Sequence, residues 1–153
     1  MTVEHPFNKI VEGIGVSDIR QFDAEVSSIP GIIKLTLGEP NFDTPEHIKE
    51  AAIQAIKDNH SHYTPNSGIP ELRQAAAEYY NKKFNFNYTA DQVITTIGAT
   101  EGINASLQAI LNPGDTVIVP TPVFPLYLPI TLVNQGNFIT VDTSNDGFVL
   151  TAD

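Results

Sequence analysis

The stretch from Val93 to Leu111 constrains the fold of this chain more than any other. It starts with the β-branched run VITTI, continues with the small-residue turn GATEG and ends with INASLQAIL. A short β-branched run of this kind predicts a buried parallel strand. The last segment predicts a helix with one apolar face, made by Ile103, Leu107, Ile110 and Leu111. The sequence therefore predicts a strand, a tight turn and a helix, which is the repeating unit of α/β folds.

The turn of this unit is a candidate anion site. The N–H groups of Ala99, Thr100 and Glu101 fall in the first helical turn, where a helix offers them no acceptor. The helix dipole adds partial positive charge at the same point, and such termini bind phosphate. Small-residue turns also end strands in folds without a ligand, so the turn alone leaves both interpretations open. The spacing is neither that of the dinucleotide fingerprint nor that of a P-loop.

Composition excludes several classes of function. The 153 residues carry 8 Lys and Arg against 18 Asp and Glu, for a net charge of −10. This charge argues against nucleic acid and anionic membranes as partners. The chain has no cysteine, which excludes a disulfide framework and any cysteine-based metal or redox site. No apolar run approaches the roughly 20 residues of a spanning helix, and the N-terminus lacks a secretory pattern. We therefore expect a cytoplasmic protein.

The remaining segments alternate between helical and strand patterns. Thr44 is expected to cap a helix that has Pro45 at its first position and ends near Asn59. Pro70 is expected to open another helix that ends near Phe84. Weaker patterns predict a helix over Asp18–Val26 and strands over Lys34–Leu37, Thr116–Val119 and Phe138–Val141. This alternation predicts a parallel sheet with right-handed crossovers and flanking helices.

Other chemistry-bearing residues give weaker signals. His60 and His62 could face one metal ion, but no third ligand is evident, so we expect no metal site. Glu39 and Glu101 could act as acid or base, although Glu101 is better explained as an acid that stabilises a helix N-terminus. A run of aromatic residues is better explained by helix packing than by base stacking, because few positive charges lie nearby. Its members are Tyr79, Tyr80, Phe84, Phe86 and Tyr88.

Four segments together resemble a known family. They are LGEP with the following Thr44-Pro45, YTPNSGIPELR from Tyr63, GATEG from Gly98, and the stretch from Pro113-Gly114-Asp115 to Pro122-Val123-Phe124. In this order and spacing they resemble the N-terminal part of a class I/II aminotransferase, a pyridoxal 5′-phosphate-dependent enzyme of the aspartate aminotransferase fold type I. Within that family the chain is most similar to bacterial aromatic-amino-acid and N-acetyl-diaminopimelate aminotransferases.

The resemblance implies roles for five residues. Ala99 and Thr100 match the cup for the cofactor phosphate, and Phe124 matches the aromatic residue that stacks on the pyridine ring. Tyr63 matches a tyrosine that reaches the cofactor phosphate of the partner subunit, which implies a homodimer. Gly38 matches the glycine whose backbone approaches the substrate carboxylate. Without the family context, each of the five has an ordinary structural explanation as a turn, loop or core residue.

The resemblance also implies a domain plan and an incomplete site. Residues 1–45 match the N-terminal arm and the start of the small domain, and residues 46–153 match the first part of the large domain. The family moves an amino group from an amino acid to a 2-oxo acid, using a lysine that holds the cofactor aldehyde. None of the six lysines here lies in the family's lysine motif, and we assign no catalytic residue. We therefore expect this chain to be a fragment that is inactive alone.

Three questions follow from this interpretation. A non-catalytic phosphate-binding or interaction module is the first alternative, and a fold-type-I amino-acid lyase fragment is the second, since it shares the cup and the stacking aromatic.

The third question is how the sheet of this chain is completed. In the family's sheet, strands from elsewhere separate the segment Val93–Ile97 from the strands at 116–119 and 138–141. Exposed edges, a rearranged sheet or association with another chain are therefore expected.

Overall fold

The computed structural model describes residues 7–15 and 17–152, which form two compact units. The unit of residues 1–32 and 97–153 is called the sheet unit here, and that of residues 33–96 the helical unit. The sheet unit contains α1 (Lys9–Glu12), α2 (Asp18–Val26), α5 (Gly98–Ile110), β1 (Thr116–Thr121), α6 (Tyr127–Val133), β2 (Asn137–Asp142) and the 3₁₀ turn η2 (Ser144–Asp146). The helical unit contains α3 (Glu46–Lys57), α4 (Pro70–Phe84) and the 3₁₀ turn η1 (Ala90–Gln92).

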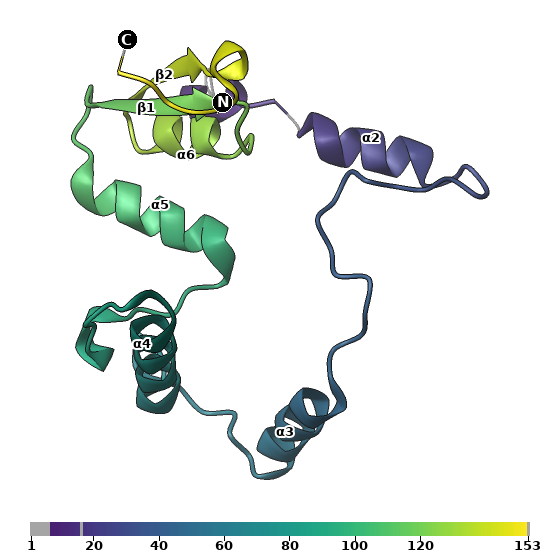
Figure 1. The fold of residues 1–153 in the computed structure, drawn as a ribbon, viewed down its shortest axis with the longest axis vertical. Coiled ribbons are helices and arrows are strands. Elements are labelled where there is room, and N and C mark those ends of the chain that lie inside the picture. Colours follow the sequence, from purple (N-terminus) through teal and green to yellow (C-terminus); the bar gives the residue numbers. More distant parts are fainter. Residues whose placement is uncertain (1–6, 16, 153) are drawn as a thin grey trace, which may run out of the picture. The chain divides into compact units, whose positions relative to one another are not determined.

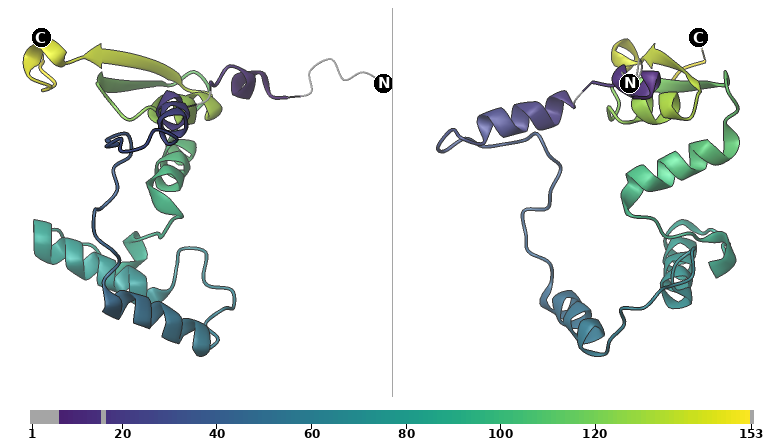
Figure 2. Two further views of the ribbon diagram at one scale, coloured as in Figure 1. Left: turned by 90° about the vertical axis from the view of Figure 1, so that its right-hand side faces the viewer. Right: turned by 180° about the vertical axis from the view of Figure 1, so that it is seen from behind.

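The sheet consists of two parallel strands joined through α6 (Figures 1 and 2). The register runs from Thr116 opposite Asn137 to Thr121 opposite Asp142. Val119 and Ile130 are buried here, and Thr131 is completely buried with its Oγ1 donating to the Tyr127 carbonyl at 2.8 Å. The predicted strands at 116–119 and 138–141 are thus confirmed as a parallel pair with a helical crossover.

The predicted strand over Val93–Ile97 is wrong. This segment is extended but joins no sheet among the described residues, and Ile94 and Ile97 are 71% and 91% exposed. Its hydrogen bonds go elsewhere, since the N–H of Thr95 donates to the Ser67 carbonyl at 3.0 Å. A strand needs a neighbour to complete its ladder, and β1 and β2 pair with each other instead. The predicted strand over Lys34–Leu37 is absent too.

The helices agree more closely with the sequence patterns. α2 and α4 have the predicted bounds. α3 begins at Glu46 with Pro45 as its N-cap, so the predicted start with a Thr44 cap is wrong by one residue. α5 begins at Gly98, so the predicted turn forms the first turn of this helix. The signals for a helix lie within a few residues of each other in the sequence. The helices were therefore predicted correctly, whereas a strand also needs a distant partner.

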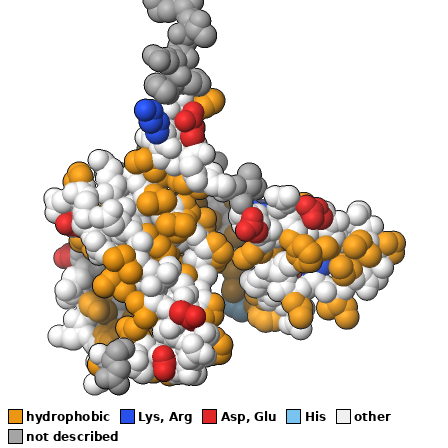
Figure 3. Space-filling view, turned by 90° about the horizontal axis from the view of Figure 1, so that it is seen from above, with side chains coloured by type: hydrophobic (Ala, Val, Ile, Leu, Met, Phe, Trp, Pro, Cys, Tyr) orange, Lys and Arg blue, Asp and Glu red, His pale blue; other side chains and the backbone are white. Residues whose placement is uncertain are grey.

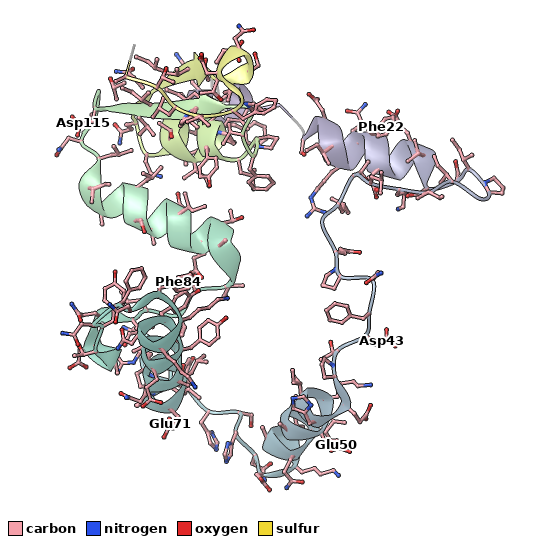
Figure 4. The ribbon with its side chains drawn as sticks, in the orientation of Figure 1. Phe22, Asp43, Glu50, Glu71, Phe84 and Asp115 are labelled. Carbon is pink, nitrogen blue, oxygen red and sulfur yellow. The ribbon has the colours of Figure 1, made fainter. Side chains whose placement is uncertain are left out.

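The aromatic run holds the end of α4 against the segment that follows it. Successive rings from Tyr79 to Tyr88 contact each other with centroids 5.3–5.8 Å apart (Phe84 is labelled in Figure 4). Asn81 fixes the return of the chain, because its amide donates to the Tyr88 carbonyl at 2.8 Å and accepts from the Tyr88 N–H at 2.7 Å. Ala77 is buried beneath. The packing interpretation of these aromatics is therefore confirmed.

A loop of the helical unit lies against the extended segment. Both the N–H and the Oγ1 of Thr95 donate to the Ser67 carbonyl, at 3.0 and 3.2 Å. The next residue, Gly68, has φ +98°, and a Cβ placed there would collide with the Thr95 side chain. Glycine is thus required here for its conformation and for its lack of a side chain.

Two carboxylates of the sheet unit should make its stability depend on pH. Asp115 (Figure 4) accepts from the Asn112 N–H at 2.7 Å and from its side-chain amide at 3.1 Å, which lowers the pKa of Asp115. The Ser144 N–H lowers the pKa of Asp142 in the same way. The pKa of each carboxyl is therefore lower in the folded state than in the unfolded state. Such a shift stabilises the fold at pH values above the unfolded-state pKa, and this stabilisation is lost as pH falls through the folded-state pKa.

We therefore expect the free energy of unfolding of this unit to decrease as pH falls below about 4. Urea unfolding followed across pH 2–7 measures this change, and NMR titration of the carboxyl carbons measures the two pKa values. Asp115→Asn should make the free energy of unfolding depend less on pH. If the variant and the wild type show the same pH dependence, Asp115 does not contribute to it.

Candidate functional site

The first turn of α5 has the geometry of an anion site. Ile97 is the N-cap, and its side chain has no atom that could accept a hydrogen bond from the helix amides. Gly98 has φ +78° with open space where a side chain would lie, and Ala99 and Thr100 are exposed. The first amides of a helix lack acceptors within it, so the N–H groups of Ala99 and Thr100 are available to a ligand.

Glu101 accepts a hydrogen bond at the start of this helix. Its carboxylate accepts a hydrogen bond from the N–H of Ile97, the residue that precedes the helix. The interpretation of Glu101 as an acid at a helix N-terminus is therefore confirmed. The contact satisfies the Ile97 amide.

The helix terminus is the main source of positive potential in this part of the chain. Residues 97–153 contain no Lys, Arg or His. Their acidic residues are Glu101, Asp115, Asp142, Asp146 and Asp153. An anion at the first turn of α5 would be held by backbone N–H groups and the helix dipole, and not by ion pairs with this segment. The residues present therefore predict weak binding of a phosphate group.

Phe124 lies in the same unit, in the short connection between β1 and α6. It follows the cis peptide bond Thr121–Pro122, and its side chain is 55% exposed. An exposed aromatic face can stack on a flat ring, which contributes about 0.5–1.5 kcal/mol beyond area burial. The sheet unit thus carries Ala99, Thr100 and Phe124, which are the three residues predicted to hold one cofactor.

The other two predicted site residues lie in the helical unit. Gly38 sits in a loop where the Glu39 N–H donates to the Leu37 carbonyl at 3.1 Å, and it has open space around its α-carbon. Tyr63 is fully exposed beside Ser61 and His62. Within its unit each residue is accessible to a ligand or to another molecule. Their assigned roles stay predictions.

The other polar residues that the structure describes form surface contacts and no metal-binding group. Among residues 7–15 and 17–152, no group of three or more His, Cys, Asp or Glu side chains is placed to hold a metal ion. Lys49 pairs with Glu46 at 2.6 Å. Lys83 donates to the Tyr79 hydroxyl at 2.8 Å and lies over the Tyr79 and Phe84 rings. These two lysines are thus held in surface contacts on their own helices.

The sequence patterns missed one contact of the helical unit, that of Ser67 and Gly68 with Thr95. Its only sequence signal is a glycine inside the predicted loop, and the two ends of the contact are 28 residues apart. Within residues 7–15 and 17–152, no helix is both long enough and apolar enough to cross a membrane.

Curated proteins similar to this chain include several that are named aminotransferases. The family "Aminotransferase class I and II" matches residues 30–153. A probable N-acetyl-LL-diaminopimelate aminotransferase of Bacillus subtilis is 45% identical over 151 residues, covering 98% of this chain and 38% of that protein. An aspartate aminotransferase of Pyrococcus horikoshii is 46% identical over 111 residues, covering 72% of this chain and 28% of that protein.

Solved structures agree with these sequence relatives. Aspartate aminotransferase of Thermus thermophilus with maleate superimposes with a TM-score of 0.89 at 34% identity, covering 96% of this chain and 40% of that one. The enzyme of Rhizobium meliloti gives a TM-score of 0.88 at 34% identity, covering 97% and 38%. This chain thus spans about two-fifths of the length of such relatives. It has the fold of their N-terminal part, and it belongs to the class I and II aminotransferases of fold type I.

Proposed function

We propose that this chain holds the phosphate and the ring of pyridoxal 5′-phosphate in an aminotransferase that moves an amino group from an amino acid to a 2-oxo acid. The observation that carries the proposal is the open first turn of α5, which lies inside the region matched by the family. When bound, this cofactor supplies an electron sink for chemistry at the amino-acid α-carbon.

The residues present fit part of that cofactor. The N–H groups of Ala99 and Thr100 would bind the phosphate oxygens, and the open space at Gly98 would let them approach the backbone closely. Phe124 would orient the ring by stacking, and as phenylalanine it donates no hydrogen bond. The Glu101 carboxylate, held by the Ile97 N–H, would fix the start of the helix.

The helical unit carries the two residues that would contact the substrate and the partner subunit's cofactor. The backbone at Gly38 would approach the carboxylate of the amino acid. Tyr63, whose side chain is fully exposed, would donate to the cofactor phosphate in a second copy of the enzyme. These assignments come from the family resemblance, and the role of Tyr63 makes a homodimer part of the proposal. We also propose a cytoplasmic location, as expected from the sequence.

Titration with pyridoxine 5′-phosphate tests the phosphate site without reaction at lysines, since this analogue has no aldehyde. We expect amide NMR shifts at 98–101 and at Phe124. Thr100→Asp should abolish them, because it adds a second carboxylate to the first turn, at one of the two amides proposed to hold the phosphate, whereas the Glu101 carboxylate is held by the Ile97 N–H. Gln108→Asp adds the same charge in the C-terminal half of α5, where Gln108 is exposed, and should leave the shifts in place.

Unphosphorylated pyridoxine and inorganic phosphate separate the two parts of the site. Phosphate alone should shift the amides of α5 and leave the Phe124 ring signals unchanged. Equal shifts in wild type and Thr100→Asp would show that the anion binds elsewhere and would refute the proposed phosphate cup.

A further inference from the structure

The turn that follows β2 contains an Asp-Gly pair, Asp146-Gly147. Among the aspartates and asparagines at positions 1–152, Asp146 alone precedes a glycine. The carboxyl carbon of an aspartate and the amide nitrogen of the next residue can join in a five-membered ring. Glycine has no Cβ, so no side chain of residue 147 shields its nitrogen from the carboxyl group. The sequence therefore makes Asp146 the aspartate that its own backbone can attack most easily.

The hydrogen bonds of this turn leave the Gly147 amide without a partner. Thr143 anchors the turn, since it is 4% exposed and its Oγ1 donates to the Thr121 carbonyl at 2.8 Å. The Thr143 carbonyl accepts from the Asp146 N–H at 3.1 Å and from the Phe148 N–H at 2.9 Å. Between these two bonds, the Gly147 N–H has no acceptor among residues 7–15 and 17–152. The nitrogen that would attack is thus not held in a hydrogen bond.

The carboxylate of Asp146 is also accessible. No hydrogen bond or ion pair with another described residue holds it, and both Asp146 and Gly147 are exposed. Acidic side chains lie at the surface in the space-filling view (Figure 3). A Cβ built on Gly147 would meet nothing within 4 Å, so the space beside the peptide bond is open. The printed hydrogen bond of this peptide plane is a long one, from the Val149 N–H to the Asp146 carbonyl at 3.3 Å.

Asp142, four residues earlier, has the opposite environment. Its carboxylate accepts a hydrogen bond from the Ser144 N–H at 2.9 Å. The amide that follows it, the N–H of Thr143, donates to the Thr121 carbonyl at 3.1 Å, and Thr143 is buried. Both groups that would have to join in a ring are therefore held at Asp142, whereas neither is held at Asp146.

We propose that Asp146 is a modification site, at which the chain converts spontaneously to isoaspartate. The Gly147 nitrogen loses its proton and attacks the Cγ of Asp146, which forms a C–N bond and releases one carboxyl oxygen as water. The cyclic succinimide then takes up one water. Opening at Cγ restores aspartate, and opening at the α-carbonyl leaves the main chain running through the former side chain. No atom is gained or lost overall, and the reaction needs no oxidant and no cofactor.

Incubation of the 153-residue chain at pH 7 and 37 °C tests this proposal. Peptide mapping with electron-transfer fragmentation locates isoaspartate, and labelling by an isoaspartyl methyltransferase measures its amount. We expect isoaspartate to form at least tenfold faster at 146 than at 142, and in the folded chain at no less than one-tenth of its rate in urea. A smaller ratio between 146 and 142, or stronger protection of 146 by folding, would overturn the proposal.

A matched pair of variants identifies the residue that reacts. Asp146→Glu keeps the charge, but its longer side chain would have to close a six-membered ring, so methyl labelling should fall at least tenfold. Asp91→Glu makes the same change at an exposed aspartate that precedes a glutamine, and it should leave the labelling unchanged. Equal labelling of the wild type and Asp146→Glu would show that another residue is modified and would refute the site.

Discussion

Replacing Gly68 by alanine is expected to unfold most of the helical unit. A side chain here must adopt φ +98°, which costs an L-residue about 1–2 kcal/mol, and its Cβ would collide with the Thr95 side chain. Forcing an extra methyl group into a filled site adds about 1–3 kcal/mol. A unit of residues 33–96 has a small core and little stability to lose. Urea unfolding followed by NMR signals of Ala77 and Tyr88 measures the loss.

Two variants show which part of the cost is steric. Gly38→Ala is the matched control, because Gly38 is in the same unit and its added Cβ would meet nothing within 4 Å. It should change the free energy of unfolding by less than about 0.5 kcal/mol. The double variant Gly68→Ala with Thr95→Ala removes the collision, so it should recover the steric part of the lost free energy of unfolding. The part that comes from the positive φ of residue 68 should remain. If Gly68→Ala alone is as stable as Gly38→Ala, the loop does not pack against Thr95 as described.

The helices of this chain could be predicted because their signals lie within a few residues of each other. Pro70 fixes the start of α4, and a weaker local pattern predicted α2. The strand over Val93–Ile97 could not be predicted in this way. Its β-branched composition is favourable only if a neighbouring strand supplies the other half of the ladder. Among the described residues, β1 and β2 form the whole sheet, so the segment stays extended and exposed.

The same distinction applies to the site. The start of a helix at 98–101 could be predicted because its small residues are contiguous in sequence, and its role in binding phosphate stays a prediction. The contact between the Glu101 carboxylate and the Ile97 N–H is also local, since the two residues are four positions apart. The contact between Ser67 and Thr95 joins residues that are 28 positions apart, so no short sequence pattern predicts it. The roles of Gly38, Tyr63 and Phe124 came from family resemblance, because an exposed glycine or aromatic residue has no local signature of function.

The 153-residue chain incubated with pyridoxal 5′-phosphate, an amino acid and a 2-oxo acid is expected to transfer amino groups no faster than the free cofactor. Transamination needs a lysine held beside the cofactor to move a proton, and a positioned group of this kind contributes about 10²–10⁴-fold. The sheet unit, which carries Ala99, Thr100 and Phe124, contains a single lysine, Lys9. That residue lies on α1, a helix of four residues with no buried side chain.

A coupled assay for the new amino acid measures the rate, with free cofactor as the reference. Borohydride reduction followed by peptide mapping tests the reason. All six lysines are exposed, so label should spread over several of them and no single Lys→Arg variant should alter the rate. The matched pair Lys9→Arg and Lys57→Arg compares the lysine of the sheet unit with one at the end of α3. Turnover above the free cofactor that disappears in Lys9→Arg alone would contradict this prediction and would make Lys9 the lysine that reacts with the cofactor.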